Sequence, residues 1–410
     1  MNGPLPRFYA AYAVILTALL FIAVLTIWVP GHWIFDGIGA VIFVLGAAWW
    51  IRLAFQPHPV RLSAVLIPLI AAILIGCLQL IVNSTVNRWE TTYAVLKWAV
   101  YLTVFFLASQ IFVDRSLGAS FRRTLLYFGF ALSIVSVLQL FTSPGRVFWI
   151  FPTEYKTDVL GPFVSPDHYA CLMELLLPLA LYEALTDKRR MLLASVAAGA
   201  MFASVIAGAS RAGSLLLTLE SVAAVLIAVG RGYASARRVS LAVLCLIALF
   251  FGTFAAVVGW SKLLARFRAS DPYRGRREML LSALDMTRAH PWTGFGLGTF
   301  GSVYPAYARY DQGLTVEHAH NDWAEWAAEG GLPFLACLIA AAILGFPSAW
   351  RSIWAIGVFF LLAHSLVDYP MQKPALALWV FAFLGYVCRT GGPRRARSHG
   401  PNAAFADDIN

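Results

Sequence analysis

Residues 7–29, RFYAAYAVILTALLFIAVLTIWV, place one arginine directly before an unbroken apolar run. From Tyr9 to Val29 this run has about the 20 residues that an α-helix needs to cross the hydrocarbon core of a bilayer. It is longer than the apolar core of a signal peptide, and no cleavage site with small residues follows it. We therefore expect a retained membrane-spanning helix, and comparable runs recur along the chain.

The composition supports the same fold class for the whole chain. Of its 410 residues, 60% are hydrophobic and 13% are charged, whereas soluble domains have roughly 45–50% and 25%. The sequence predicts an all-α polytopic membrane protein with about twelve transmembrane helices and one long periplasmic loop that contains short helices. The expected spans are 9–29, 37–56, 63–83, 93–113, 124–142, 167–186, 191–210, 213–230, 239–260, 332–347, 353–369 and 374–388.

Basic residues predict the orientation. More than half of the 31 Lys and Arg residues fall on alternate short connections, beginning with the N-terminus. The positive-inside rule puts these connections and both termini in the cytoplasm. We expect transmembrane helices in 1–260, a periplasmic catalytic loop at 261–331, further helices in 332–390 and a disordered cytoplasmic tail at 391–410. The net charge of +10 is then a topology signal, and nucleic acid is not an expected partner.

The five cysteines all lie within apolar runs, and none has a CxxC partner. They are Cys77, Cys171, Cys245, Cys337 and Cys388. This distribution predicts buried thiols and excludes both a disulfide framework and a zinc-finger type of site.

The interval 261–331 carries most of the candidate chemistry. Its basic residues are Lys262, Arg266, Arg268, Arg274, Arg276, Arg277, Arg288 and Arg309. An ordinary solvated loop would explain them, but arginine also suits phosphate because its planar fork bonds two oxygens at once. Residues 277–289 predict a short amphipathic helix. The stretch TGFGLGTFGSVYP at 293–305 predicts a tight turn that lets backbone approach a ligand or another helix, because a nucleotide loop would need a different glycine order.

The stretch VEHAHNDWAEW, residues 316–326, puts His318 and His320 directly before a predicted helix. Asn321 is a good N-cap, and Gly330-Gly331 would end the helix. A helix start disfavours a protonated imidazole, so a histidine there can accept a proton as a general base. Two alternatives stay open at this point: a structural or capping histidine, and a metal site that uses acids of the same helix, although the spacing is not HExxH.

Ionisable residues inside apolar helices are costly and are therefore functional candidates. Arg211, in GASRAGS, stands at the outward end of a span, where small neighbours leave room for a ligand. The others are Lys97, Glu174, Glu220, His364 and Asp368, the last two of which are one helical turn apart. Buried ion pairs would explain any two of these. His168 lies in the first turn of a further helix, where capping alone would explain the local sequence.

Five segments in this order resemble the O-antigen ligase and Wzy polymerase superfamily of bacterial inner membranes. They are GPFVSPDHYA, ASRAGS, RREMLLSALDM with HPWTGFGLGTF, HAHNDWAEWAAEGGLP and HSLVDYPMQKP. The resemblance implies a multi-pass inner-membrane enzyme that moves a glycan from undecaprenyl pyrophosphate to an acceptor hydroxyl at the periplasmic face. It also implies inversion at the sugar, no metal and no cofactor. Its partners would be the lipid-linked donor, a lipid or glycan acceptor, and membrane lipids.

The resemblance also implies roles for particular residues. His320 would be the base, and Arg211 with Arg276 would stabilise the pyrophosphate; the doubled arginine leaves the choice between Arg276 and Arg277 open. Leu280 stands where many relatives have tryptophan, which weakens the alignment there. The other expected substrate-binding residues are His168, Arg277, Arg288, His318, Asn321 and Asp368.

Other functions are compatible with parts of the sequence. Within the same class, the chain could be a Wzy-type polymerase of O-antigen or exopolysaccharide, or a protein-directed oligosaccharyltransferase. A transporter of about twelve helices is an alternative of another class, because buried charges also mark ion paths. Neither an inverted repeat nor a matched pair of broken helices supports it. A passive scaffold subunit is the remaining alternative.

Overall fold

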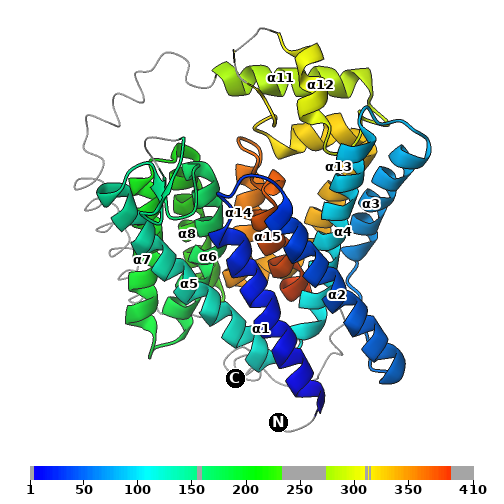
Figure 1. Cartoon of the computed structure of the whole chain (residues 1–410). Helices are drawn as coiled ribbons and strands as arrows, with labels where there is room; N and C mark the ends of the chain where they lie inside the picture. Colours follow the sequence, from blue (N-terminus) through cyan, green and yellow to red (C-terminus); the bar gives the residue numbers. More distant parts are fainter. Residues whose placement is uncertain (1–3, 155–158, 233–273, 310–312, 314, 389–410) are drawn as a thin grey trace.

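The described chain is almost entirely helical, so the all-α class is confirmed. The structure is a computed structural model that describes residues 4–154, 159–232, 274–309, 313 and 315–388. A bundle of long helices carries two short helices, α11 and α12, across one end (Figure 1). The helices are α1 Pro4–Leu25, α2 Trp33–Phe55, α3 Leu66–Ile81, α4 Arg88–Ile111, α5 Arg115–Thr142, α6 Pro166–Thr186, α7 Met191–Ala207, α8 Arg211–Gly230, α11 Arg274–Ala289, α12 Phe300–Tyr307, α13 Asp322–Trp350, α14 Gly357–His364 and α15 Pro374–Cys388. The 3-10 turns η2 Ile353–Ala355 and η3 Pro370–Gln372 and the paired strands β1 Arg146–Val147 and β2 Phe151–Pro152 are short.

Seven of the described helices are long and apolar enough to cross a membrane: α1, α2, α4, α5, α6, α8 and α13. Shorter apolar segments at α3, α7, η2–α14 and α15 coincide with four more predicted spans. The span predicted at 239–260 lies outside the described residues. The polytopic membrane character is confirmed, whereas the number twelve is not. A 16-residue helix such as α3 is about 24 Å long, shorter than a hydrocarbon core of about 30 Å.

Two helices, α6 and α15, lie at the centre of the bundle. All residues of α15 from Ala375 to Cys388 are buried, and nearly all of α6 is buried as well. A helix that is apolar all round is expected inside a bundle and not at its edge. Gly385 lets α15 approach α4 closely, because a Cβ there would lie 2.2 Å from the carbonyl oxygen of Phe105. Both central helices therefore provide rigid starting points for the polar segments that precede them.

Helix α13 changes direction at Gly331, where the backbone has φ 70° and ψ 178°. The predicted stop at Gly330-Gly331 is therefore confirmed, but a second helical segment follows without a loop. The break leaves the carbonyl oxygens of Ala328 and Glu329 without their helical partners, because Leu332 N–H donates to the Pro291 carbonyl instead (2.7 Å) and Pro333 has no N–H. The glycine-rich turn supplies new donors, as Phe295 N–H donates to Ala328 (3.1 Å) and Gly296 N–H donates to Glu329 (2.9 Å).

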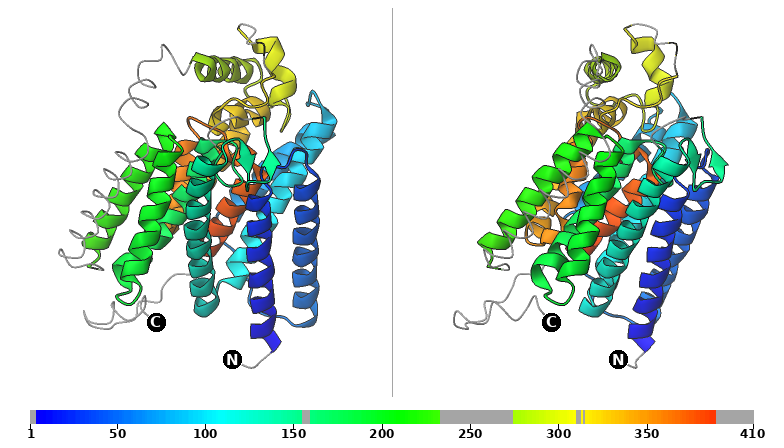
Figure 2. Two further views of the ribbon diagram at one scale, coloured as in Figure 1. Left: turned by 60° about the vertical axis from the view of Figure 1, so that its left-hand side comes forward. Right: turned by 90° about the vertical axis from the view of Figure 1, so that its left-hand side faces the viewer.

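The helices α11 and α12 lie on the first half of α13, above the long helices in every view (Figure 2). Their apolar faces meet there in a small cluster separate from the main core. It contains Met279, Ala283, Met286, Phe300, Val303, Tyr304, Ala319, Ala324 and Ala328. The amphipathic helix predicted at 277–289 is thus confirmed, beginning three residues earlier than expected. We call this end of the molecule the α11–α12 end.

Candidate functional site

Five segments far apart in the sequence meet at the α11–α12 end. They are the start of α6, the residue before α8, the first turn of α11, the residues before α13, and the turn between α14 and η3. Side-chain caps fix three of these helix starts. Ser165 accepts from His168 N–H, Ser210 accepts from Gly213 N–H, and Asn321 accepts from Ala324 N–H. A cap of this kind stabilises a helix by about 1 kcal/mol, so the backbone that carries the polar side chains is well defined.

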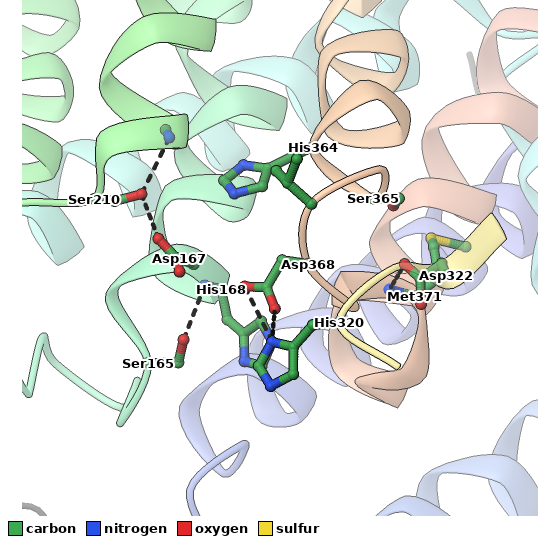
Figure 3. Close-up of polar contacts among 12 residues, drawn as sticks. Ser165, Asp167, His168, Ser210, His320, Asp322, His364, Ser365, Asp368 and Met371 are labelled. Atoms are coloured by element: carbon green, nitrogen blue, oxygen red, sulfur yellow. Dashed lines mark hydrogen bonds and ion pairs between the residues drawn. The ribbon is translucent and has the colours of Figure 1, made fainter. Parts of the chain in front are cut away.

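The imidazole of His320 and the carboxylate of Asp368 form a pair. His320 Nδ1 lies 3.0 Å from Asp368 Oδ1, and Figure 3 shows the carboxylate turned toward this ring. Because an ionised carboxylate only accepts hydrogen bonds, Nδ1 carries the proton and Nε2 keeps its lone pair. The His320 side chain is 28% exposed, whereas that of Asp368 is 2% exposed. The geometry therefore leaves an accessible ring that can take up a proton at Nε2.

Backbone and amide contacts hold this pair in place. His320 has a φ of 50°, a left-handed conformation that is uncommon for a residue other than glycine. The Asn321 amide donates to the carbonyl of Leu366 (2.7 Å), and Asp322 N–H donates to the carbonyl of Ser365 (2.9 Å). The loop before α13 is thus fastened to the turn after α14, and the unusual backbone at His320 is stabilised by the bonds on its C-terminal side.

Asp368 remains ionised although it is buried. Burial would raise its pKa, but the hydrogen bond with His320 and the positive charges around it, including the Arg276 guanidinium, outweigh burial and hold the pKa well below its usual range. His168 Nε2 lies 3.9 Å from the other carboxylate oxygen, which is beyond hydrogen-bonding distance. His168 is itself 5% exposed. The structure therefore places it as a buried neighbour of Asp368, with little surface for a substrate.

Arg276 joins the cluster through Asp167. Its guanidinium donates to Asp167 Oδ2 (2.7 Å) and to the carbonyl of Val367 (3.0 Å), one residue before Asp368. Asp167 also accepts from the Ser210 hydroxyl (2.6 Å), and Ser210 directly precedes Arg211. Arg276 and Ser210, the residue before Arg211, thus bind the same carboxylate. Arg277 is exposed. The sequence did not decide which of the two arginines belongs to the site, and the structure favours Arg276.

Arg288 lies apart from this cluster. It is 72% exposed and pairs with Asp285 on its own helix at 2.7 Å. Asp285 also binds Arg309 at 2.7 Å. Two exposed arginines thus share one surface carboxylate, and the structure gives no support to a substrate-binding role for Arg288. A surface pair of this kind adds little stability.

The acids of α13 do not lead away from the histidines as the sequence suggests. Glu325 accepts from His318 Nδ1 (2.9 Å) and from Ala319 N–H (2.7 Å), since the loop folds back over the first turn of the helix. His318 and His320 therefore turn to different carboxylates. Among the described residues they do not converge with acids on a common point, so the alternative of a metal held by this pair is not supported.

Tyr369 is a residue that sequence reasoning missed. Its ring stacks on His318 at 4.6 Å and meets His320 edge-on at 4.6 Å, and it also meets His168 at 4.8 Å. One aromatic side chain thus contacts three histidines of the site. Asp167 was missed as well. Its place one residue before His168 in a helix start was read as capping alone, although the side chain binds Arg276 instead.

Two aromatic residues near the histidines are parts of the core. Trp326 is 4% exposed and Tyr304 is 6% exposed. Stacking of a sugar ring needs an accessible face, so the structure does not offer these two as a sugar platform. Trp323 is partly exposed and donates its indole N–H to the carbonyl of Leu362 (3.0 Å).

Replacing Asp368 with asparagine is expected to lower transfer activity by about 10–100-fold, as for other groups that orient a functional imidazole. The amide keeps the shape but removes the charge that fixes the proton on Nδ1 of His320. The measurement is the initial rate at saturating donor, with detergent-extracted yield and thermal midpoint as controls of folding. Activity within two-fold of the parent protein would show that the carboxylate does not orient the base.

The profile of the O-antigen ligase family (Wzy_C) matches residues 196–339. A search of the curated proteins found no match for the chain. The matched part contains Arg211, Arg276 and His320, whereas their partners Asp167 and Asp368 lie on either side of it. A family of this kind indicates a glycosyltransferase-like membrane enzyme of the O-antigen ligase or polymerase type. Residues 196–339 of the chain are therefore similar to the O-antigen ligase family.

Proposed function

We propose that this protein is an inverting glycosyltransferase that moves a glycan from undecaprenyl pyrophosphate to an acceptor hydroxyl. The acceptor would be the core of lipid A or a similar glycan. One observation carries the proposal. The accessible imidazole of His320 is paired with the buried carboxylate of Asp368 at one end of the helical bundle. Arg276 lies beside this pair, since it donates to the carbonyl of Val367, one residue before Asp368. A general base and a pyrophosphate-binding guanidinium are the two groups that this reaction requires.

The proposed reaction is a single displacement at the anomeric carbon. The acceptor oxygen attacks this carbon while the anomeric bond to the pyrophosphate oxygen breaks, so the configuration inverts. The acceptor proton passes to Nε2 of His320, and the proton on Nδ1 stays with Asp368. Arg276 and Arg211 stabilise the negative charge that grows on the departing pyrophosphate. Because that group leaves easily, no metal is placed at the bond that breaks.

An apolar groove supports a site for the isoprenoid tail of the donor. It runs along α14 between α8 and α13 and has a volume of about 280 Å³. Ile227, Trp350 and Phe359 line it, and Ala363 forms its end next to His364. The groove thus reaches the end of α14, the helix that leads into the turn of Asp368. A tail lying there would place the pyrophosphate near Arg276.

The proposed orientation puts the α11–α12 end in the periplasm and both chain termini in the cytoplasm of a bacterial inner membrane. The course of the first and last described helices supports it, since α1 begins and α15 ends toward the end of the bundle away from α11 and α12 (Figure 1). With the positive-inside pattern of the short connections, this puts the site where polyprenyl-linked glycans are displayed.

The test is transfer by the purified protein in proteoliposomes, with an undecaprenyl-pyrophosphate glycan and lipid A–core as substrates. The expected product is the acceptor enlarged by one glycan, formed in buffer without added magnesium or manganese. Longer lipid-linked chains in place of this product would indicate a polymerase, and glycosylated peptide would indicate a protein-directed transferase. Failure of a folded, correctly inserted protein to transfer glycan to any of these acceptors would contradict the proposal.

A further inference from the structure

A second polar cluster lies deeper in the bundle and takes no part in the proposed reaction. It consists of Cys171 and Glu174 on α6, Glu220 on α8 and His364 at the end of α14, and each is buried with 0% exposure. Glu174 and Glu220 lie eight and nine residues after the starts of their helices. At a rise of about 1.5 Å per residue, both are therefore about 12–14 Å below the α11–α12 end.

Helix spacing and one glycine bring these side chains together. Cys171 and Glu174 are three residues apart and so face the same side of α6. Glu174 Oε1 lies 2.7 Å from His364 Nδ1. A Cβ on Gly357 would lie 2.0 Å from the Glu174 carbonyl oxygen and 3.0 Å from Glu220 Oε1, so the absent side chain lets α14 approach both helices. One donor atom each from Cys171, Glu174 and His364 lies within 4.8 Å of the other two.

Four polar atoms of this cluster have no hydrogen-bond partner within the part of the chain that the structure describes. They are Glu174 Oε2, Glu220 Oε1, Glu220 Oε2 and His364 Nε2. A buried carboxylate without a partner is very costly, and in native proteins such groups bind a proton, an ion or water. The cluster contains two carboxylates and one imidazole, and of the two carboxylates only that of Glu174 contacts the imidazole. If both carboxylates are ionised, His364 can pair with one negative charge and the other is left buried without a partner among the described residues.

We propose that Cys171, Glu174, Glu220 and His364 bind one divalent metal ion, and that this ion is zinc. The donors are one sulfur, one imidazole nitrogen and carboxylate oxygens, a combination that zinc accepts and that calcium and magnesium, which prefer oxygen alone, do not. The charge of the ion balances two of the three negative charges that the Cys171 thiolate and the two carboxylates bring. A ring nitrogen of His364 also lies within 4.8 Å of carboxylate oxygens of Asp167 and Asp368, so the cluster adjoins the carboxylates of the site above it.

The ion would join the three helical segments that support the catalytic cluster. Helix α6 carries Asp167, α8 begins next to Ser210, and α14 leads into the turn of Asp368. Its role is structural, because the donors lie below the site and away from the exposed ring of His320. Cys171 is buried, as the sequence predicts, and the proposal adds a role as a metal ligand. The proposal does not depend on the proposed glycan transfer.

The experiment measures zinc in the purified full-length protein by inductively coupled plasma mass spectrometry. We expect about one zinc per chain. The variants Glu220→Gln and His364→Gln are expected to bind zinc at least about 10-fold more weakly in a competition titration against a colorimetric chelator. Added zinc should raise the thermal midpoint of the chelator-treated parent protein and should leave that of Glu220→Gln unchanged. Glu183→Gln is the matched control, since Glu183 lies on the same helix and pairs with Arg123 and Arg190 instead.

Two results would overturn this proposal. One is folded parent protein that contains no zinc and binds none when zinc is added at micromolar concentration. The other is a Glu174→Gln and Glu220→Gln double variant that binds zinc as tightly as the parent protein, because the carboxylates would then not be its ligands. The first of these results is measured on the parent protein only, so it does not depend on whether a variant folds.

Discussion

Replacing His320 with glutamine is expected to reduce the rate of glycan transfer by about 10²–10⁴-fold, the usual contribution of a general base. Glutamine keeps a hydrogen-bonding group near Asp368 but has no nitrogen that takes up a proton at neutral pH. Donor binding should change little, because the arginines that we propose as ligands of the pyrophosphate are untouched. The measurement is single-turnover transfer in proteoliposomes, with donor affinity determined separately.

The matched control for this variant is His290→Gln. His290 is an exposed histidine between α11 and the glycine-rich turn, and its replacement should leave transfer unchanged. The pH dependence gives a second readout. The lowered pKa of Asp368 keeps its carboxylate ionised well below neutral pH, so an acid limb of the rate between pH 5 and 8 reports an imidazole, which is the side chain that ordinarily titrates there. A His320→Gln protein that keeps both its rate and this acid limb would refute the role of His320.

Replacing Arg276 with alanine is expected to lower transfer by about 10²–10³-fold, the cost of removing one well-placed donor to a developing negative charge. Arg276→Lys should recover only part of this loss. Lysine keeps the charge but lacks the planar fork that bridges Asp167 and the Val367 carbonyl. The effect should fall on the chemical step more than on donor affinity, because the charge on the pyrophosphate grows as the anomeric bond breaks.

Arg309→Ala is the control for Arg276. Arg309 is also an arginine near the α11–α12 end, but it pairs with Asp285 on an exposed surface, so its loss should leave the rate within two-fold. Double variants sharpen the test. If Arg276 and Asp167 act as a pair, Arg276→Ala with Asp167→Asn should cost less than the sum of the two single losses. Independent, additive losses would show that Asp167 does not position this guanidinium.

Local features of the site could be predicted from the sequence because short-range physics determines them. A run of about 20 apolar residues specifies a membrane helix, a 3.6-residue period specifies the apolar face of α11, and an asparagine before an apolar run specifies the start of α13. Local sequence also predicts the break in α13. The positive φ of Gly331 favours glycine, and Pro333, two residues later, lacks the N–H that would continue the helix. His320 was therefore identified beside a helix start without any knowledge of the fold.

The partners of these residues could not be predicted from the sequence. Arg276 lies 109 residues after Asp167 and 92 residues before Asp368 along the chain, yet the three form one cluster. The sequence left Arg276 and Arg277 equivalent, included Arg288 in the site, missed Tyr369 and read the acids of α13 as lying away from His318. The packing of distant helices decides the contacts of Arg276 and Tyr369, and the fold of the loop before α13 decides which acid His318 meets.

The sequence by itself thus determined the membrane-embedded helical class, the helix starts and the residue types needed for acid–base and phosphate chemistry, because each depends on neighbours within a few turns of chain. The tertiary structure alone decided which carboxylate each histidine and arginine meets, and where Glu174, Glu220 and His364 come together. The physical reason is that a side chain spans only a few ångströms. Its partners therefore depend on how helices distant in sequence pack together, and a short sequence pattern does not specify that packing.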